Sequence, residues 1–253
     1  LTPDFFANFA TENQTSPEII FAIPYDSKAG TVGNYMSSMS CHYLQKLAIS
    51  PTGNYPWSAN GMCGQPGLYS KFDDTDKRKK CMVAGDQINL ATGSVIIMDN
   101  GEPLTYTENL TSLTDAKENE GVRLGKYEMK AGENWERDHD LVLIRYAEIL
   151  MMQAECHVRL GAPDLAKPFL QQITGRAGEE MPAIIDLKFI DQELLKEFTF
   201  EGRRRTDNIR FGTFFLPWWE KGATDKTRAI FPIPSSVLTT NKNLVQNPGY
   251  PVN

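Results

Sequence analysis

The sequence predicts a mainly α-helical protein that combines paired helices with extensive ordered loops. Two observations carry this prediction. Residues 140–212 contain the apolar spacing of amphipathic helices. Residues 11–134 are rich in Gly, Pro, Asn, Ser and Thr, and residues 217–253 form a proline-punctuated coil. Since no boundary between these parts has the composition of a flexible linker, we expect a single domain over residues 1–253.

The composition limits the classes of function. With 253 residues and 41% hydrophobic content, the chain can bury a sizeable core. Its formal net charge of −6 provides no clustered positive field for phosphates, so we expect no nucleic-acid partner. The sequence has no run of 18 or more apolar residues, and its start lacks the basic and apolar regions of a signal peptide. We therefore expect no membrane span in this chain.

The cysteines and histidines give no metal signature. They are scattered, without CxxC spacing, at Cys41, Cys63, Cys81, Cys156, His42, His139 and His157. The stretch FDDTDKRKK (72–80) has three aspartates but lacks the Gly and closing Glu of an EF-hand loop, so we interpret it as a solvated turn. We expect no metal and no cofactor. The cysteine count is compatible both with two disulfides and with free thiols.

The predicted elements follow in chain order. The runs EIIFAI (18–23) and SVIIMD (94–99) predict brief strands or extended segments. The stretch DLVLIRYAEILMMQAECHVRLG predicts a helix, since one face carries Ile144, Ala147, Met151, Ala154 and Val158. Gly161 is placed to end this helix in the left-handed conformation, and Pro163 to begin the next one.

This helix pair fits the register of a tetratricopeptide repeat. The packing positions of the repeat fall on Leu150, Ala154, His157, Gly161, Ala166 and Leu170, with Ala and His where Gly and Tyr are usual. A single unit of a solenoid cannot bury its own face. We therefore expect neighbouring units that are either disguised in this sequence or absent from it.

A third helix is predicted to start at Asp186 as N-cap and to run into EGRRRTDNIRFG (201–212). Its expected apolar face is Leu187, Ile190, Leu194 and Phe198. Glu201 lies three and four residues from Arg204 and Arg205, and Asp207 lies three residues from Arg204 and from Arg210. Arg145 and Glu148, and Glu155 and Arg159, have similar spacing. Such self-paired charges indicate a structural network rather than a catalytic site.

Several of these strings resemble the SusD/RagB family of surface nutrient-binding lipoproteins of Bacteroidetes. The matching strings are SPEIIFAIPYD, LIRYAEILMMQAECHVRLG, EGRRRTDNIRFG and FPIPSSVLTTNKNLVQNPGY, which occur in the family's order between about residues 16 and 250. The arginine-rich string departs from the family pattern at Arg205 and Thr206, where the family has an aromatic pair, and at Asn208, where it has Leu.

The resemblance implies a SusD-like fold with tetratricopeptide-like helix pairs, of which this chain is the C-terminal portion. It also implies a non-enzymatic protein on the extracellular face of the outer membrane, held by a lipid anchor outside this chain. Such a protein captures starch-like or other glycans, or in some branches peptides, and passes them to a SusC-like TonB-dependent transporter.

Aromatic side chains beside amides are expected in a sugar-binding site, because a sugar ring presents C–H groups to an aromatic face and hydroxyls to polar groups. The stretch GNYPWSAN (53–60) provides Tyr55 and Trp57 as a predicted surface platform, with Asn60 as a polar contact. Tyr43 is a further candidate. The alternative is that these rings pack inward over a core, as we expect for Trp135, Trp218 and Trp219.

Two other functions remain open on the sequence. A glycoside hydrolase needs two carboxylates across a cleft. Asp73, Asp76, Asp86 and Asp99 are available, although nothing in the sequence pairs them. A tetratricopeptide scaffold that binds only protein or peptide is favoured by the repeat and disfavoured by the long non-helical stretch before it.

Overall fold

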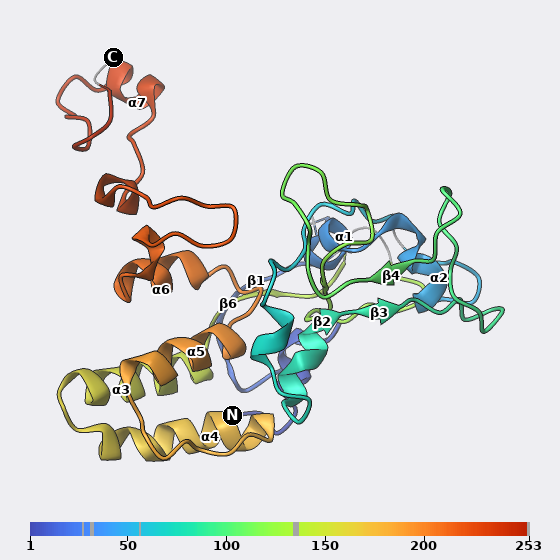
Figure 1. The fold of residues 1–253 in the computed structure, drawn as a ribbon, viewed down its shortest axis with the longest axis horizontal. Helices are drawn as coiled ribbons and strands as arrows, with labels where there is room; N and C mark the ends of the chain where they lie inside the picture. The colour runs from blue at the N-terminus through green and yellow to red at the C-terminus, as the bar shows by residue number, and fades with distance from the viewer. Residues whose placement is uncertain (27, 31–32, 56, 134–136, 252–253) are drawn as a thin grey trace. The chain divides into compact units, whose positions relative to one another are not determined.

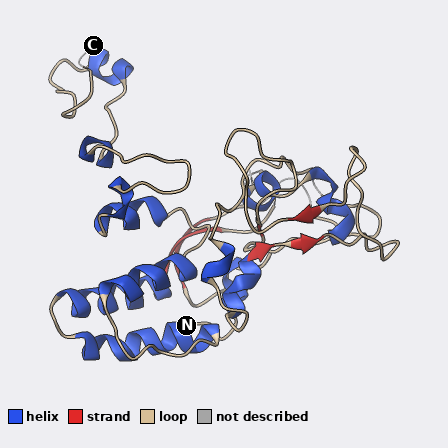
Figure 2. Ribbon diagram, in the orientation of Figure 1, coloured by secondary structure: helices blue, strands red, loops and turns tan. Residues whose placement is uncertain are grey.

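The computed structural model of the chain describes residues 1–26, 28–30, 33–55, 57–133 and 137–251. The chain forms two compact units, Leu1–Gly202 and Arg203–Asn253, and each is considered by itself. The described part is rich in helices, with few and short strands (Figures 1 and 2). The first unit places the helices α3, α4 and α5 beside a layer of loops and short strands.

The strands of the first unit pair over short distances. Strand β1 (Ile19–Ile23) pairs antiparallel with β6 (Leu141–Arg145), β2 (Met82–Val83) with β5 (Arg123–Leu124), and β3 (Gly85–Asp86) with β4 (Thr105–Tyr106). The strand predicted over 18–23 is therefore confirmed. The stretch 94–99 is extended and forms isolated bridges, from Val95 to Ile88 and from Ile97 to Pro103.

The loop-rich layer also contains two short helices, α1 (Met36–Ser40) and α2 (Lys46–Ile49). Beside α2, the side chains of Leu44 and Leu47 pack against a core of Ile96, Met98, Leu104 and Tyr106. This small core contains no residue of α3, α4 or α5, so the loop-rich layer has apolar packing of its own.

Helix α3 (Tyr146–Arg159) begins two residues later than its apolar pattern predicts. Ile144 belongs to strand β6 and is 37% exposed, so its predicted place on the helix face is wrong. The cause is Arg145, whose extended backbone turns its side chain into a buried cluster of charges. Ala147, Met151 and Ala154 form the buried face as expected.

Helices α3 and α4 (Lys167–Ala177) form an antiparallel hairpin (Figure 1). Gly161 takes the left-handed conformation at φ +76°, and Pro163 starts the 3-10 turn η5 (Pro163–Ala166), as predicted. The buried contacts of the hairpin include Leu150, Ala154, Ala166 and Leu170. The His157 ring stacks on Phe169 with the ring centres 5.7 Å apart.

Helix α5 (Leu187–Glu197) packs against α3 and begins at the predicted cap. The Asp186 carboxylate accepts a hydrogen bond from the backbone N–H of Phe189 at 2.8 Å. The helix does not continue into the arginine-rich string, and this expectation is wrong. Phe200 and Gly202 take positive φ values of 64° and 74°, which break the helix before α6 (Arg204–Arg210) begins in the second unit.

A network of buried charges joins the helices of the first unit to its loop-rich layer. Glu197, at the end of α5, is fully buried. One of its carboxylate oxygens accepts hydrogen bonds from Arg145 and Arg176, each at 2.5 Å, and the other accepts from Arg78 at 3.1 Å. Glu18 accepts from Arg145 and Arg176 as well, at 3.0 and 2.6 Å. These contacts join segments that lie far apart in the sequence.

Glu201 belongs to the same network. Its carboxylate accepts from Arg145 at 2.8 and 2.9 Å and from Lys126 at 2.6 Å. The predicted local pairing of Glu201 with Arg204 and Arg205 is therefore wrong. The local pairs between Glu155 and Arg159 and between Asp207 and Arg210 are confirmed, each with an N–O distance of 2.8 Å.

Arg78, in the 3-10 helix η4 (Lys77–Cys81), ties the aspartate-rich stretch to α5. Its guanidinium donates to both oxygens of Asp76, at 2.9 and 2.8 Å, and to Glu193 at 2.5 Å. Asp76 is buried, so the interpretation of this stretch as a solvated turn is wrong at that residue. A buried carboxylate needs such a partner, because water does not reach it.

The three arginines around Glu197 keep its buried carboxylate charged, as its pKa shows. Burial by itself raises this pKa, but Arg145, Arg176 and Arg78 lower it overall below its usual value. The pKa of Glu201 is also lowered, since Arg145 and Lys126 outweigh burial. A carboxylate whose pKa is depressed by folding stabilises the fold above its unfolded pKa, and this contribution is lost as the pH falls through the folded pKa.

The second unit is organised around its closing segment. The side-chain amide of Gln246 accepts from the backbone N–H of Ile233 at 2.8 Å and donates to the carbonyl of the same residue at 2.9 Å. The Tyr250 hydroxyl donates to the carbonyl of Ile230 at 2.8 Å. These bonds fold the end of the chain, beyond α7 (Ser235–Thr240), back on the PIP segment. Arg205 lies over the Phe231 ring at 4.2 Å.

We predict that Arg145→Met lowers the free energy of unfolding by about 3–5 kcal/mol, because it removes the cation shared by three buried carboxylates, Glu18, Glu197 and Glu201. The matched control is Arg159→Met, which removes a partly exposed ion pair and is expected to cost about 0–1 kcal/mol. Urea unfolding of both variants measures the difference. Equal and small losses would show that the buried network contributes little.

Candidate functional site

The loop around residues 57–62 is fixed against helix α1. The backbone N–H groups of Ala59, Asn60 and Gly61 donate to the carbonyls of Ser38, Cys41 and Met39, at 2.7, 2.9 and 2.7 Å. Asn60 takes a positive φ of 53°, a conformation that asparagine tolerates better than most residues. The backbone of the loop is thus held against α1.

Trp57 and Tyr55 lie in different environments. The Trp57 side chain is 61% exposed, whereas Tyr55 is only 7% exposed. The Tyr55 hydroxyl accepts a hydrogen bond from Arg137, whose guanidinium also lies over the Tyr55 ring at 4.8 Å. The predicted surface platform shared by both rings is therefore wrong for Tyr55. Pro56 and Trp135 lie outside the described residues.

The Asn60 side chain is largely occupied by the protein itself. Its oxygen accepts from two nitrogens of Arg123, at 3.1 and 3.0 Å, and its nitrogen donates to the carbonyl of Glu118 at 2.8 Å. These bonds use the oxygen and one N–H of the amide. Asn60 therefore holds the loop, and it has one remaining N–H with which to contact a ligand.

Tyr43 is partly exposed, while its neighbour Leu44 packs inward. Its hydroxyl donates to the Asp99 carboxylate at 2.5 Å, and its ring lies against His42 with centres 4.2 Å apart. The hydrogen bond to Asp99, together with smaller contributions from burial and nearby charges, raises the pKa of Tyr43 to about 12. The tyrosine therefore stays neutral and bonded to Asp99 at physiological pH.

Glu118 connects Tyr43 to Asn60. Its carboxylate lies 3.3 Å from the Nε2 atom of His42, which contacts Tyr43, and its carbonyl accepts from Asn60 and Arg123. The structure thus ties Tyr43 and Asn60 to one surface region. Sequence reasoning missed two exposed methionines, Met39 in α1 and Met62 in the loop. The backbone N–H of Met62 donates to the carbonyl of Met39 at 3.1 Å.

Three of the four carboxylates considered for hydrolysis are hydrogen-bonded to other side chains. Within the described residues, no group of three or more His, Cys, Asp and Glu side chains is arranged to hold a metal ion. All four cysteines, each of which the structure describes, are free thiols. Of the carboxylates considered for hydrolysis, Asp76 is paired with Arg78, Asp86 accepts from Thr105 at 2.6 Å and Asp99 accepts from Tyr43.

We also searched the described helices for a segment that could span a membrane. Among the described helices, none combines the length and the apolar character needed to cross a bilayer.

Comparison with known proteins places the chain in a family. A model of the SusD family matches residues 17–229. The starch-binding protein SusD of Bacteroides thetaiotaomicron is 35% identical over 124 residues, which are 45% of this chain and 22% of that protein. SusD-like protein P38 of Formosa agariphila is 22% identical over 274 aligned positions, covering 96% of this chain and 49% of that protein.

Solved structures share the fold. Surface glycan-binding protein A of Bacteroides thetaiotaomicron matches 98% of this chain and 55% of its own length, with a TM-score of 0.73 and 24% identity. A structure of that protein in complex with laminarihexaose matches equally well. A laminarin-binding SusD-like protein matches with a TM-score of 0.72 and 20% identity, over 99% of this chain and 54% of its own.

Because the family model matches most of the chain, the chain belongs to the SusD family. Its fold is helix-rich and is shared with these solved structures. The chain spans about half the length of the structural relatives.

The two aromatic residues should differ sharply in their effect on stability. We predict that Tyr55→Ala lowers the free energy of unfolding by about 3–5 kcal/mol, as for other buried large aromatic residues. Trp57→Ala should change it by no more than about 0.5 kcal/mol, since the exposed ring contributes little to the core. Chemical unfolding of both variants checks this. Loss of the fold in Trp57→Ala would contradict the assignment of this ring to the surface.

The buried imidazole of His139 should make stability depend on pH. Burial, and then the charge of Arg137, lower its pKa from 6.5 to about 4, while Glu133 lies 3.6 Å from its Nε2 atom. As the pH falls below 6.5, the unfolded chain binds a proton that the folded chain excludes, so stability falls until about pH 4.

Between pH 7.5 and pH 5 the expected loss from His139 is about 2 kcal/mol. His139→Gln should lack this part of the pH dependence. Unfolding of both proteins at the two pH values measures it. An unchanged pH dependence in the variant would contradict the prediction.

Proposed function

We propose that this chain is part of a non-enzymatic cell-surface protein that binds glycans, with Trp57 as the main contact for a sugar ring. The observation that carries the proposal is the exposed Trp57 on a loop that backbone hydrogen bonds hold in place. A ring carried by a held backbone loses less conformational freedom on binding than one on an unanchored loop, so more of its stacking energy contributes to affinity.

Groups on the same loop and on the segments joined to it support this role. Exposed Met39 and Met62 add apolar area of the kind that sugar C–H faces contact, and Tyr43 with Asp99 adds directional polar groups. The second amide hydrogen of Asn60 is a further donor. Tyr55 acts beneath the surface, through its contact with Arg137, instead of touching the stacked ring.

The relatives support the same class of function. Their names describe a starch-binding protein, a surface glycan-binding protein bound to laminarihexaose and a laminarin-binding protein. These ligands are neutral polymers of glucose, which gain more from ring stacking and hydrogen bonds than from charge. A net charge of −6 does not oppose such ligands.

The proposal also covers the cellular location of the protein, its transport partner and the type of its helical repeat. The protein that contains this chain is anchored by lipid on the extracellular face of the outer membrane. It passes glycans to a SusC-like TonB-dependent transporter. The α3–α4 hairpin is a tetratricopeptide-like unit, a view supported by the buried residues at the repeat's packing positions and by His157 stacking in place of the usual Tyr.

Affinity electrophoresis in gels containing starch, laminarin and other polysaccharides tests the proposal. At least one polysaccharide should retard the protein. Trp57→Ala should weaken binding by about 1–3 kcal/mol, the scale of an aromatic contact residue. The matched control is Trp218→Ala, which removes an indole that is 40% exposed in the other unit and should leave retardation unchanged.

Incubation of the protein with the same polysaccharides should release no sugar. Release of oligosaccharides would support a hydrolase and contradict binding without catalysis. Retardation that survives Trp57→Ala unchanged would show that the sugar binds elsewhere on the protein.

A further inference from the structure

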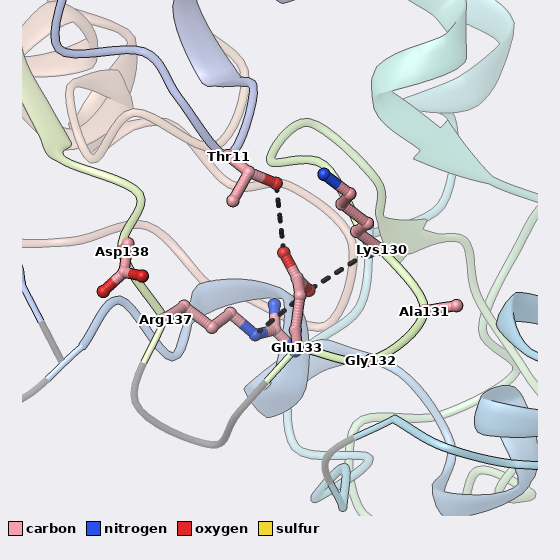
Figure 3. A pocket seen from close by; sticks show the side chains of 7 residues that line it. All are labelled: Thr11, Lys130, Ala131, Gly132, Glu133, Arg137 and Asp138. Carbon is pink, nitrogen blue, oxygen red and sulfur yellow. Dashed lines mark hydrogen bonds and ion pairs between the residues drawn. The ribbon is translucent and has the colours of Figure 1, made fainter. Parts of the chain in front are cut away.

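A small polar pocket lies next to the loop that carries Trp57. It encloses about 210 Å³, and its lining, shown in Figure 3, is Thr11, Lys130, Ala131, Gly132, Glu133, Arg137 and Asp138. One water needs only about 10–15 Å³, whereas pockets for drug-sized ligands measure about 300–1,000 Å³. The pocket therefore suits a ligand group larger than a single water and smaller than an extended chain.

Arg137 gives this pocket buried hydrogen-bond donors that have no partner within the described residues. The residue is only 2% exposed, and one terminal nitrogen of its guanidinium donates to Ser38 at 2.6 Å and to Tyr55. Its Nε and Nη1 atoms are buried and have no hydrogen-bond partner within the described residues. The nearest carboxylate oxygen, on Glu133, lies 3.8 Å from Nε, which is too far for a hydrogen bond. Buried donors of this kind normally have a partner.

The acceptors of the pocket face the same space. The two oxygens of Glu133 accept from the Thr11 hydroxyl and from the backbone N–H of Lys130, each at 3.1 Å (Figure 3). Each carboxylate oxygen can accept a further hydrogen bond. Glu133 therefore provides hydrogen-bond acceptors beside the donors of Arg137 in the pocket lining.

The charges of the pocket are balanced. Lys130 and Arg137 are basic, and Glu133 and Asp138 are acidic. An anion would be attracted by one pair and repelled by the other, so it gains little net energy. A neutral ligand with neighbouring hydroxyls gains from both, because each hydroxyl can donate to a carboxylate and accept from a guanidinium or an ammonium group.

Two hydrogen bonds join residues of the pocket to the segment that precedes Trp57. The backbone N–H of Gly132 donates to the carbonyl of Asn54 at 2.9 Å, and Arg137 bonds to Tyr55. These two contacts lie two and three residues before Trp57 in the sequence.

We propose that this pocket binds the hydroxyls of one neutral sugar ring of the same glycan that stacks on Trp57. The inference rests on the proposed glycan-binding function and adds to it a polar subsite. Arg137, Glu133 and Lys130 contact the sugar directly. Tyr55 is a positioning residue, since its hydroxyl holds the Arg137 guanidinium at the pocket wall.

Titration calorimetry with laminarihexaose and maltohexaose tests the subsite. Lys130→Ala, Glu133→Gln and Tyr55→Phe should each weaken binding of the preferred hexasaccharide about 3- to 10-fold, the value of a lost hydrogen bond. The matched control, Lys188→Ala, removes an exposed lysine from α5 and should bind like the unmodified protein. Thermal melting of each variant verifies its fold, and exposed Lys130 can be removed without disturbing the core.

The outcomes separate the two proposals. If Trp57→Ala weakens hexasaccharide binding while all the pocket variants bind like the unmodified protein, the pocket holds water only and the subsite is refuted. If no hexasaccharide or polysaccharide binds the unmodified protein, the proposed function fails and the subsite fails with it. A parallel titration with sodium sulfate should show no binding. Binding of sulfate that is lost in Lys130→Ala would identify an anion site and refute the sugar subsite.

Discussion

The carboxylate of Glu197 is the point on which the first unit depends. It is buried at the end of α5 and binds Arg78 from η4, Arg145 from the end of β6 and Arg176 from α4. Each of these arginines is costly to bury alone, and each is accommodated because the others and their carboxylates are present. The network therefore requires helices, strands and loops to assemble together.

The network also reaches the candidate site through Lys126. Its ammonium group donates to Glu201 and to the carbonyls of Glu197 and Thr199, at 3.0 and 2.9 Å. Just before it in the sequence, the backbone N–H of Leu124 in β5 donates to Ser40, whose hydroxyl donates to the carbonyl of Met62. The backbone from Leu124 to Lys126 thus connects the hydrogen bonds of the helices with those of the loop that presents Trp57.

Local features of this fold could be predicted from the sequence, and long-range ones could not. The Asp186 cap, the left-handed Gly161 and the Glu155–Arg159 pair each depend on residues close together in the chain. The partners of Arg145 and Glu201 lie up to 127 residues away, so helical spacing gave the wrong pairs. Likewise, nothing in the local sequence distinguishes Tyr55 from Trp57, whereas the buried Tyr55 bonds to Arg137, 82 residues away.

Membership of the SusD family and the exposed ring of Trp57 lead to the same account, in which a rigid loop presents an aromatic surface to a glycan. A crystal structure of the protein with laminarihexaose or maltohexaose tests it most directly. The account predicts a sugar ring stacked on Trp57, with Tyr55 still buried against Arg137. A sugar bound elsewhere, with Trp57 free of contact, would contradict it.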